Sequence, residues 1–221
     1  MRSKLFKHKI QKSIFFIELN IVLLILCVTI GCLSSYENHL KLAMVAISND
    51  NYDEAIEELT KAVEINLKRA TAYSWRGSCY YQKAQYVLAI DDFTTAINLK
   101  DKGIDHDYNS RGLSYSAIGD YRSAISDYTK AIEIYPNPLY YDNRGLAYNS
   151  QKNYDLAIKD FTVAINLAPR DARLYSNRAD SYIATGQTSL AIADLRKTIE
   201  LALDDPALTQ SANDRLRGLG Q

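Results

Sequence analysis

The sequence predicts an all-α solenoid built from five similar helical hairpins. An Arg followed by a small residue recurs about every 34 residues, with the small residue at Gly77, Gly112, Gly145 and Ala179. Within each segment, apolar residues recur at three- and four-residue intervals on both sides of a polar turn, which indicates two amphipathic helices. The chain is 47% apolar and holds only four prolines and nine glycines in 221 residues, which excludes a disordered or collagen-like chain.

The chain opens with a basic stretch followed by a short apolar run. Residues 1–31 hold five basic side chains against one acidic residue, Glu18. The apolar run over 21–30 has ten residues, short of the roughly 20 that a membrane-spanning helix needs. This arrangement is typical of an export signal. Residues 28–32, VTIGC, resemble the lipobox of bacterial lipoprotein precursors, which implies cleavage before Cys32 and lipidation of its thiol.

Two alternatives to the lipoprotein signal stay open. The first is an uncleaved signal-anchor over 14–33, with Glu18 near its end, and the second is a buried helix of a soluble protein. Under the lipoprotein and anchor interpretations alike, the basic flank stays cytoplasmic and everything after residue 33 is exported. We therefore expect residues 1–31 to be a signal peptide or signal-anchor and residues 32–35 to be a short tether.

Five repeats follow, the first weaker than the others. Numbered from the first residue of each repeat, position 8 is small, position 20 is Ala, and positions 4, 11, 17 and 24 are mostly aromatic. Small residues let two helices approach closely, and the large rings fill the space between hairpins. This pattern resembles the tetratricopeptide repeat (TPR), which implies a right-handed superhelical solenoid. The predicted repeats cover 36–69, 70–104, 105–137, 138–171 and 172–205.

A capping helix is predicted after the last repeat, over 206–221. Leu208, Ala212 and Leu216 recur at four-residue intervals and form one apolar stripe. Stacked repeats need such a cap because an uncovered last hairpin exposes an apolar face. The second repeat has one residue more than the usual 34, which predicts a bulged loop at 102–105.

Four repeats pair an arginine at position 7 with an aspartate at position 23. Because both positions flank apolar sites, we expect half-buried salt bridges between the two helices, within a repeat or across to the next. Unrelated solvated charges are the alternative. Four identical positions in four hairpins indicate scaffold rather than a ligand site. The residues are Arg76, Arg111, Arg144, Arg178, Asp92, Asp127, Asp160 and Asp194.

The TPR resemblance implies that positions 2, 5, 9, 12 and 13 of the first helices line a concave surface that binds proteins or peptides. Only one of these 25 residues is Lys or Arg, so the basic clamp with which some TPR proteins hold chaperone carboxylates is absent. Trp75, at position 6, is a candidate either for a binding hot spot or for packing. Solvated polar residues are the alternative for each candidate contact. The candidate contacts are Tyr81, Asn109, Asn143, Asn149 and Asn177.

The residue inventory favours a binding protein over an enzyme. Three scattered His, three Cys and no GxSxG, HExxH, CxxC or phosphate loop assemble no nucleophile or metal site, so we expect no enzyme and no cofactor. Cys79 is expected to be a small buried hydrophobe. A formal net charge of zero gives no reason to expect nucleic acid, and we expect no small-molecule substrate.

The sequence therefore predicts a membrane-tethered adaptor that binds a protein or peptide partner. The resemblance to bacterial TPR lipoproteins implies a place in the cell envelope, facing the periplasm or the cell surface. A self-associating structural scaffold is the alternative function. The acidic side chains of the first hairpin (Asp53, Glu54, Glu57 and Glu58) argue mildly against end-to-end stacking.

Overall fold

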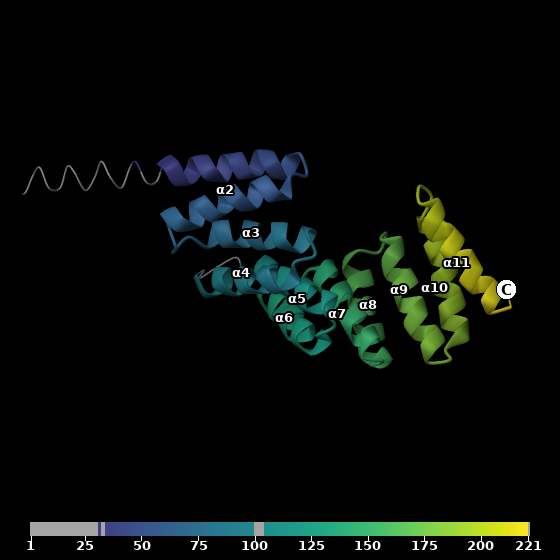
Figure 1. Ribbon diagram of the computed structural model, residues 1–221. Coiled ribbons are helices and arrows are strands. Elements are labelled where there is room, and N and C mark those ends of the chain that lie inside the picture. Colours follow the sequence, from purple (N-terminus) through teal and green to yellow (C-terminus); the bar gives the residue numbers. More distant parts are fainter. Residues whose placement is uncertain (1–30, 32–33, 100–103, 221) are drawn as a thin grey trace, which may run out of the picture.

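The computed structural model describes residues 31, 34–99 and 104–220, and over these residues it is a solenoid of helices without strands (Figure 1). This confirms the predicted all-α repeat fold. The leader up to residue 30, Cys32 and residues 102–103 of the predicted bulge lie outside the described residues. An N-terminal helix over 34–48 comes first. The helices that follow are α2 (Tyr52–Ile65), α3 (Ala70–Gln82), α4 (Tyr86–Leu99), α5 (Asp105–Ala117), α6 (Tyr121–Ile134), α7 (Pro138–Ser150), α8 (Tyr154–Leu167), α9 (Ala172–Ala184), α10 (Thr188–Leu201) and α11 (Pro206–Gly218).

The turn inside each hairpin depends on a left-handed residue at position 15. This residue has φ between 55° and 81° in all five repeats. A left-handed residue just past a helix end reverses the chain and lets the last carbonyl groups be hydrogen-bonded. Glycine supplies this conformation in two repeats, whereas three repeats accept a side chain there. The residues are Asp50, Ala84, Gly119, Lys152 and Gly186.

Close approach of the two helices explains the small residue at position 8. A Cβ atom added to Gly145 would lie 2.7 Å from a ring carbon of Phe161 at position 24, and one added to Gly112 would lie 2.7 Å from the Tyr128 ring. At Gly77 the corresponding distance, to the Phe93 ring, is 3.1 Å. The first and last repeats pack differently at these two positions. They have alanine at position 8 and leucine at position 24, all fully buried: Ala43 and Leu59, Ala179 and Leu195.

The C-terminal end of the stack is closed by α11, which packs on α10. Its Ala212 and Leu216 are buried in one cluster with Ala179 and Leu195. The helix starts where Asp205 accepts a hydrogen bond from the backbone N–H of Leu208. None of the described helices is long and apolar enough to span a membrane.

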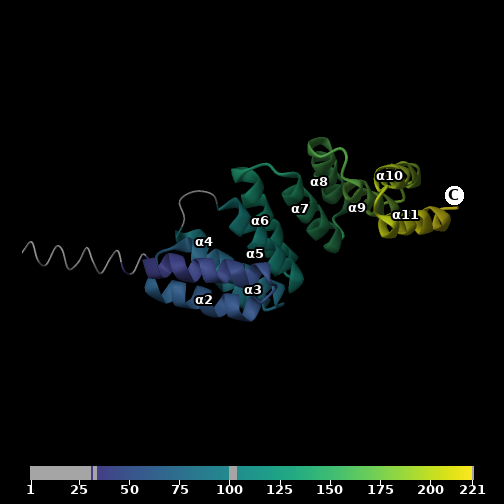
Figure 2. The ribbon, with the colours of Figure 1, turned by 90° about the horizontal axis from the view of Figure 1, so that it is seen from above.

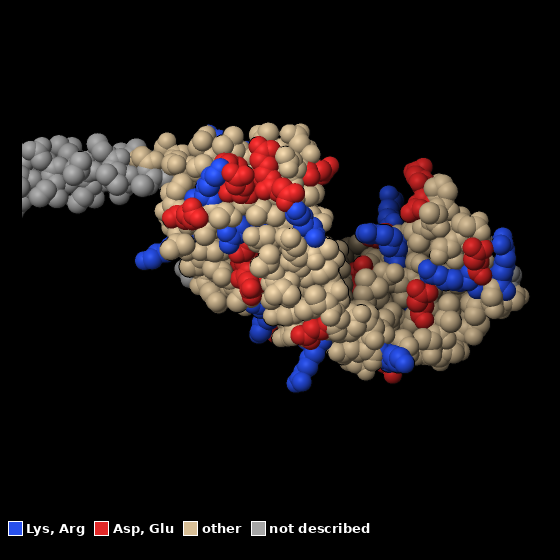
Figure 3. Space-filling model, viewed as in Figure 1, with Lys and Arg blue, Asp and Glu red and all other residues tan. Residues whose placement is uncertain are grey.

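The first helices of the repeats form the inner layer of the solenoid. Each helix packs on the next one along the chain, and α3, α5, α7 and α9 also contact one another in that order. In a curved stack the layer whose members meet is the inner one. Figure 2 shows α7, α9 and α11 on one side of the C-terminal half and α6, α8 and α10 on the other. Figure 3 shows the surface hollowed between the N-terminal repeats and the C-terminal helices.

Candidate partner-binding groove

The exposed residues of the inner layer lie at positions 2, 9, 12 and 13 of the first helices, and we call this surface the inner groove. Position 5 does not belong to it. All five residues at that position are buried, so the expectation that they line the open surface is wrong. They lie between neighbouring first helices, where these helices approach each other. The residues are Leu40, Ser74, Asn109, Asp142 and Ser176.

The predicted asparagine contacts connect consecutive repeats through hydrogen bonds. Asn143 Nδ2 donates to Asn109 Oδ1 at 2.8 Å, and Ser181 Oγ donates to Asn149 Oδ1 at 2.8 Å. Asn177 Nδ2 donates to an oxygen of Asp142, also at 2.8 Å. Among buried side-chain polar atoms of the described residues, only the Tyr36 hydroxyl has no partner, so the atoms that these bonds leave unused face solvent.

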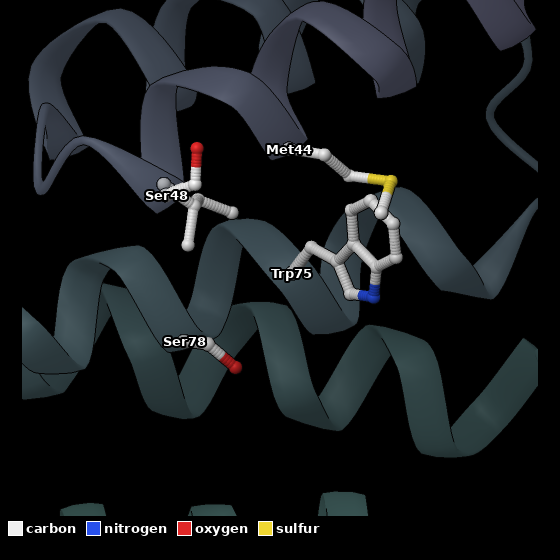
Figure 4. Close-up of a pocket in the computed structure, with 5 residues that line it drawn as sticks. Met44, Ser48, Trp75 and Ser78 are labelled. Carbon is white, nitrogen blue, oxygen red and sulfur yellow. The ribbon is translucent and has the colours of Figure 1, made fainter.

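An apolar hollow of about 350 Å³ lies at the N-terminal end of the inner groove (Figure 4). Met44 and Ile47 come from the N-terminal helix and Trp75 from α3, and the hydroxyls of the two lining serines donate to backbone carbonyl groups of their own helices. Met44 is 54% exposed, and Trp75 also packs against the core of the first repeat. The packing interpretation of Trp75 is therefore confirmed, while another part of the indole lines the hollow and its role as a binding hot spot stays a prediction. The lining residues are Met44, Ile47, Ser48, Trp75 and Ser78.

Sequence reasoning missed this hollow because its walls come from two repeats. The available signal was the apolar pair Met44 and Ile47 at positions 9 and 12, next to Trp75 at position 6 of the following repeat. In the other repeats these positions hold mostly polar or smaller side chains. A comparison of neighbouring repeats, rather than of each repeat alone, would have found it.

The middle of the inner groove is more polar. A smaller hollow of about 120 Å³ lies there, with Leu113, Leu146 and Asn143 among its walls. Tyr81 is half-buried outside both hollows, and its ring meets that of Tyr86 edge-on at 5.5 Å. Burial raises the pKa of the Tyr81 hydroxyl. Tyr81 is thus held in place by its neighbour while keeping part of its surface in contact with solvent.

Two carboxylates lie toward the C-terminal end of the inner layer, Asp180 in the inner groove and Asp142 buried between neighbouring first helices. Burial raises the pKa of Asp142, although the hydrogen bond from Asn177 opposes that shift. Burial also raises the pKa of Asp180, against the effect of Arg215, whose Nη1 lies 3.0 Å from the carboxylate. The described residues contain no group of three side chains able to hold a metal ion. Cys79 is buried, and burial raises the pKa of its thiol to about 11.

The Arg and Asp residues of positions 7 and 23 form two-pronged salt bridges within each of four repeats. Nε and Nη2 of each arginine donate to the two aspartate oxygens at 2.7–2.9 Å. Nη1 donates across to a threonine of the preceding repeat at 2.9–3.1 Å. Each guanidinium also lies within 6.0 Å of two tyrosine ring centres. All three guanidinium nitrogens are thus used inside the solenoid. The pairs are Arg76–Asp92, Arg111–Asp127, Arg144–Asp160 and Arg178–Asp194.

This fold defines an all-α helical repeat protein. Family models of the tetratricopeptide repeat match residues 40–103, 108–138, 139–171 and 172–205. The chain belongs to the tetratricopeptide repeat family.

Solved structures of similar fold include MamA and YrrB. The MamA structure has a TM-score of 0.71 at 20% identity and covers 76% of this chain and 92% of MamA. YrrB, described as a TPR protein with an unusual peptide-binding site, has a TM-score of 0.67 at 21% identity over 80% of this chain and 90% of its own. A FAM10 family protein of Arabidopsis thaliana is 37% identical over 82 residues, which is 36% of this chain and 18% of the relative. The chain thus spans under a fifth of that relative's length.

Proposed function

We propose that this protein is an adaptor that binds an extended segment of a partner protein along the inner groove, anchored by one apolar side chain. The apolar hollow between Met44 and Trp75 carries the proposal. None of the described residues that line the hollow is charged, so a neutral apolar side chain loses least free energy on entering it. Further along, the solvent-facing amide atoms of Asn143 and Asn177 suit the N–H and C=O groups of an extended backbone. An adaptor of this kind needs no cofactor and no small-molecule substrate.

Trp75 provides the test, because it is the single tryptophan of the chain and it lines the hollow. Peptides selected from a displayed random library against the full chain are titrated while indole emission is followed. We expect the selected peptides to share an apolar residue and to shift that emission. Met44→Ala weakens their binding at least about tenfold, as for truncation of an anchor contact.

The control is Leu203→Ala, since Leu203 is exposed in the loop before α11, away from the hollow. This substitution leaves peptide affinity unchanged. Peptides that bind both variants equally, or that leave the indole emission unmoved, contradict an anchor in this hollow.

The sequence before the first repeat supports a second part of the proposal, a membrane tether in a bacterial cell envelope. A basic stretch, a ten-residue apolar run and the VTIGC motif at 28–32 are together typical of a lipoprotein signal. The mass of the N-terminal peptide, taken from protein extracted from membranes, tests this part. A chain beginning at a lipidated Cys32 supports the lipoprotein. A chain that retains unmodified residues 1–31 replaces it by the signal-anchor.

A further inference from the structure

One face of the N-terminal helix is uncovered at positions that every later repeat buries. From the second repeat onward, the first helix packs on the second helix of the preceding repeat. Positions 3 and 10 are buried in that contact in all four cases. In the N-terminal helix the same positions are exposed, and Val45 at position 10 is 59% exposed. The buried counterparts are Ala72, Asp107, Tyr140 and Leu174 at position 3, and Cys79, Ser114, Ala147 and Ser181 at position 10.

The uncovered face has the composition of a helix–helix contact. Asn38, Leu42, Val45 and Asn49 follow one another at intervals of four, three and four residues, and we call them the end stripe. They lie on the opposite side of the helix from the residues that pack into the core, such as Leu40. Leu42 is 45% exposed where the other repeats have the arginine of the salt bridge. Within the described residues nothing covers this stripe.

We propose that the end stripe is the interface with a second copy of this chain, the two N-terminal helices packing side by side in parallel. Spacings of four and three residues are those of a coiled-coil seam, with the aliphatic pair at its centre. The stripe carries no charge, and the acidic side chains of the first hairpin lie on α2 outside it, so no like charges meet within the seam. An asparagine amide both donates and accepts, so each asparagine pairs with its own counterpart. The residues beside the seam, Lys41 and Ala46, set no like charges against each other.

The opposite end of the molecule limits this association to two copies. There α11 already covers the last hairpin, with Ala212 and Leu216 buried beneath it. The described residues leave no second stripe of this kind at that end for a third copy, so a two-fold symmetric pair closes on itself.

Because the stripe is small, the pair is stable only where two copies are held close together. Two aliphatic and two amide side chains on each copy bury less than the roughly 1,200 Å² of a stable interface. The pair is therefore weak in dilute solution and gains from any tether that holds two copies on one membrane. The parallel orientation rests on the proposed tether, since both helices then start from the same membrane surface. The pairing of the two stripes does not depend on that tether.

Two tagged forms of the full chain, made together and extracted from membranes in detergent, test the pairing. Val45→Glu places a carboxylate in the seam, and we expect at least about a tenfold loss of the co-purified copy. Val87→Glu is the matched control, because Val87, at the start of α4, is 63% exposed and undergoes the same substitution. This variant retains the second copy. Equal helix content by circular dichroism shows that both variants are folded. A parent chain that never co-purifies, or an equal loss in both variants, overturns the proposal.

A disulfide tests the orientation separately. In Leu42→Cys, each new thiol faces its counterpart only in the parallel pair, so oxidised membranes yield a covalent dimer above the level of the parent chain, which has only its native cysteines. If the second copy still co-purifies but no covalent dimer forms, the parallel orientation is wrong and the pair gives no support to the membrane tether. Peptide binding at Met44 and Trp75 is read by indole emission, so failure of the groove is distinguishable from failure of the pair.

Discussion

The first repeat and the four that follow share one backbone plan but differ in what holds them together. In the later repeats an arginine forks onto an aspartate of the same hairpin and reaches a threonine of the hairpin before. The first repeat has Leu42 and Glu58 at the corresponding positions. Glu58 instead accepts hydrogen bonds from His39 and Lys61, each at 2.7 Å. The arginine fork is thus a device for connecting a repeat to its predecessor, and the first described repeat does without it.

The inner groove differs in the same way between its two ends. At the N-terminal end Met44, Ile47 and Trp75 present apolar surface, whereas further along Asn143 and Asn177 present amides bonded to the preceding repeat. Position 6 thus holds an indole at one end and an amide at the other. The side chain at one repeated backbone position thus decides whether that position lines a hollow, as Trp75 does, or connects two repeats, as Asn143 does.

The largest expected effect comes from removing one partner of a fork. Asp160→Ala leaves the Arg144 guanidinium, 17% exposed, without its counter-charge and costs about 3 kcal/mol. Glu58→Ala in the first repeat costs about 1 kcal/mol or less, because its partners His39 and Lys61 are closer to water. Urea unfolding followed by circular dichroism measures both.

A double-mutant cycle on Arg144 and Asp160 separates the pair from its surroundings. We expect a coupling above about 1 kcal/mol between Arg144→Ala and Asp160→Ala. Additive single effects contradict a coupled fork.

A smaller effect is expected where glycine makes room for a ring. Gly145→Ala puts a Cβ 2.7 Å from Phe161 and costs about 1–2 kcal/mol, after the gain in helix propensity is set against the overpacking. Gly77→Ala costs less, since its Cβ would lie 3.1 Å from Phe93. Thermal unfolding of the two variants measures the difference.

The outer repeats supply the control for this experiment. They already contain alanine with leucine at positions 8 and 24, as in Ala179 with Leu195. Adding Phe161→Leu to Gly145→Ala reproduces that pair and restores part of the lost stability. If the second substitution only adds a further loss, the tight contact with the ring is not the cause.

The sequence predicted the repeat period, the helix pairs and the family, because the same residue pattern recurs in several repeats. Arg144 and Asp160 were recognisable as partners since the same two residues recur at the same spacing in four hairpins. The threonines that accept from the arginine Nη1 atoms were not recognised, because each contact crosses to the next repeat and depends on how the hairpins stack. They are Thr60, Thr94, Thr129 and Thr162, at position 25.

Positions that depend on curvature or backbone conformation escaped prediction. Asn109 and Asp142 are buried because neighbouring first helices converge on the inner side, which no single-repeat pattern contains. The left-handed turn at position 15 holds Asp50, Ala84 and Lys152 as well as glycine, so its residues carry no common signal. Partner contacts follow from such details of stacking, which explains why the fold was easier to predict than the groove.

The smallest expected effect is the pH dependence of stability, which runs in opposite directions for Glu58 in the first repeat and for Asp142 in the fourth. Hydrogen bonds from Lys61 and His39 lower the pKa of Glu58, so its stabilisation is present above the ordinary glutamate pKa and is lost as pH falls through the lowered value. Burial raises the pKa of Asp142, so the folded chain holds that proton more tightly than the unfolded chain does. The contribution of Asp142 to stability is then fully present below the ordinary aspartate pKa and is lost as pH rises through the raised value.

Asp142→Asn keeps an oxygen that accepts from Asn177 but removes the titration, so the variant is more stable than the parent at about pH 7 and equal to it at about pH 3. Urea midpoints at the two pH values measure this, with Glu58→Gln expected to be less stable than the parent at about pH 7 and to approach it on acidification. An Asp142→Asn variant that loses stability at neutral pH would mean that the folded chain holds this carboxylate charged, and the raised pKa would then be wrong.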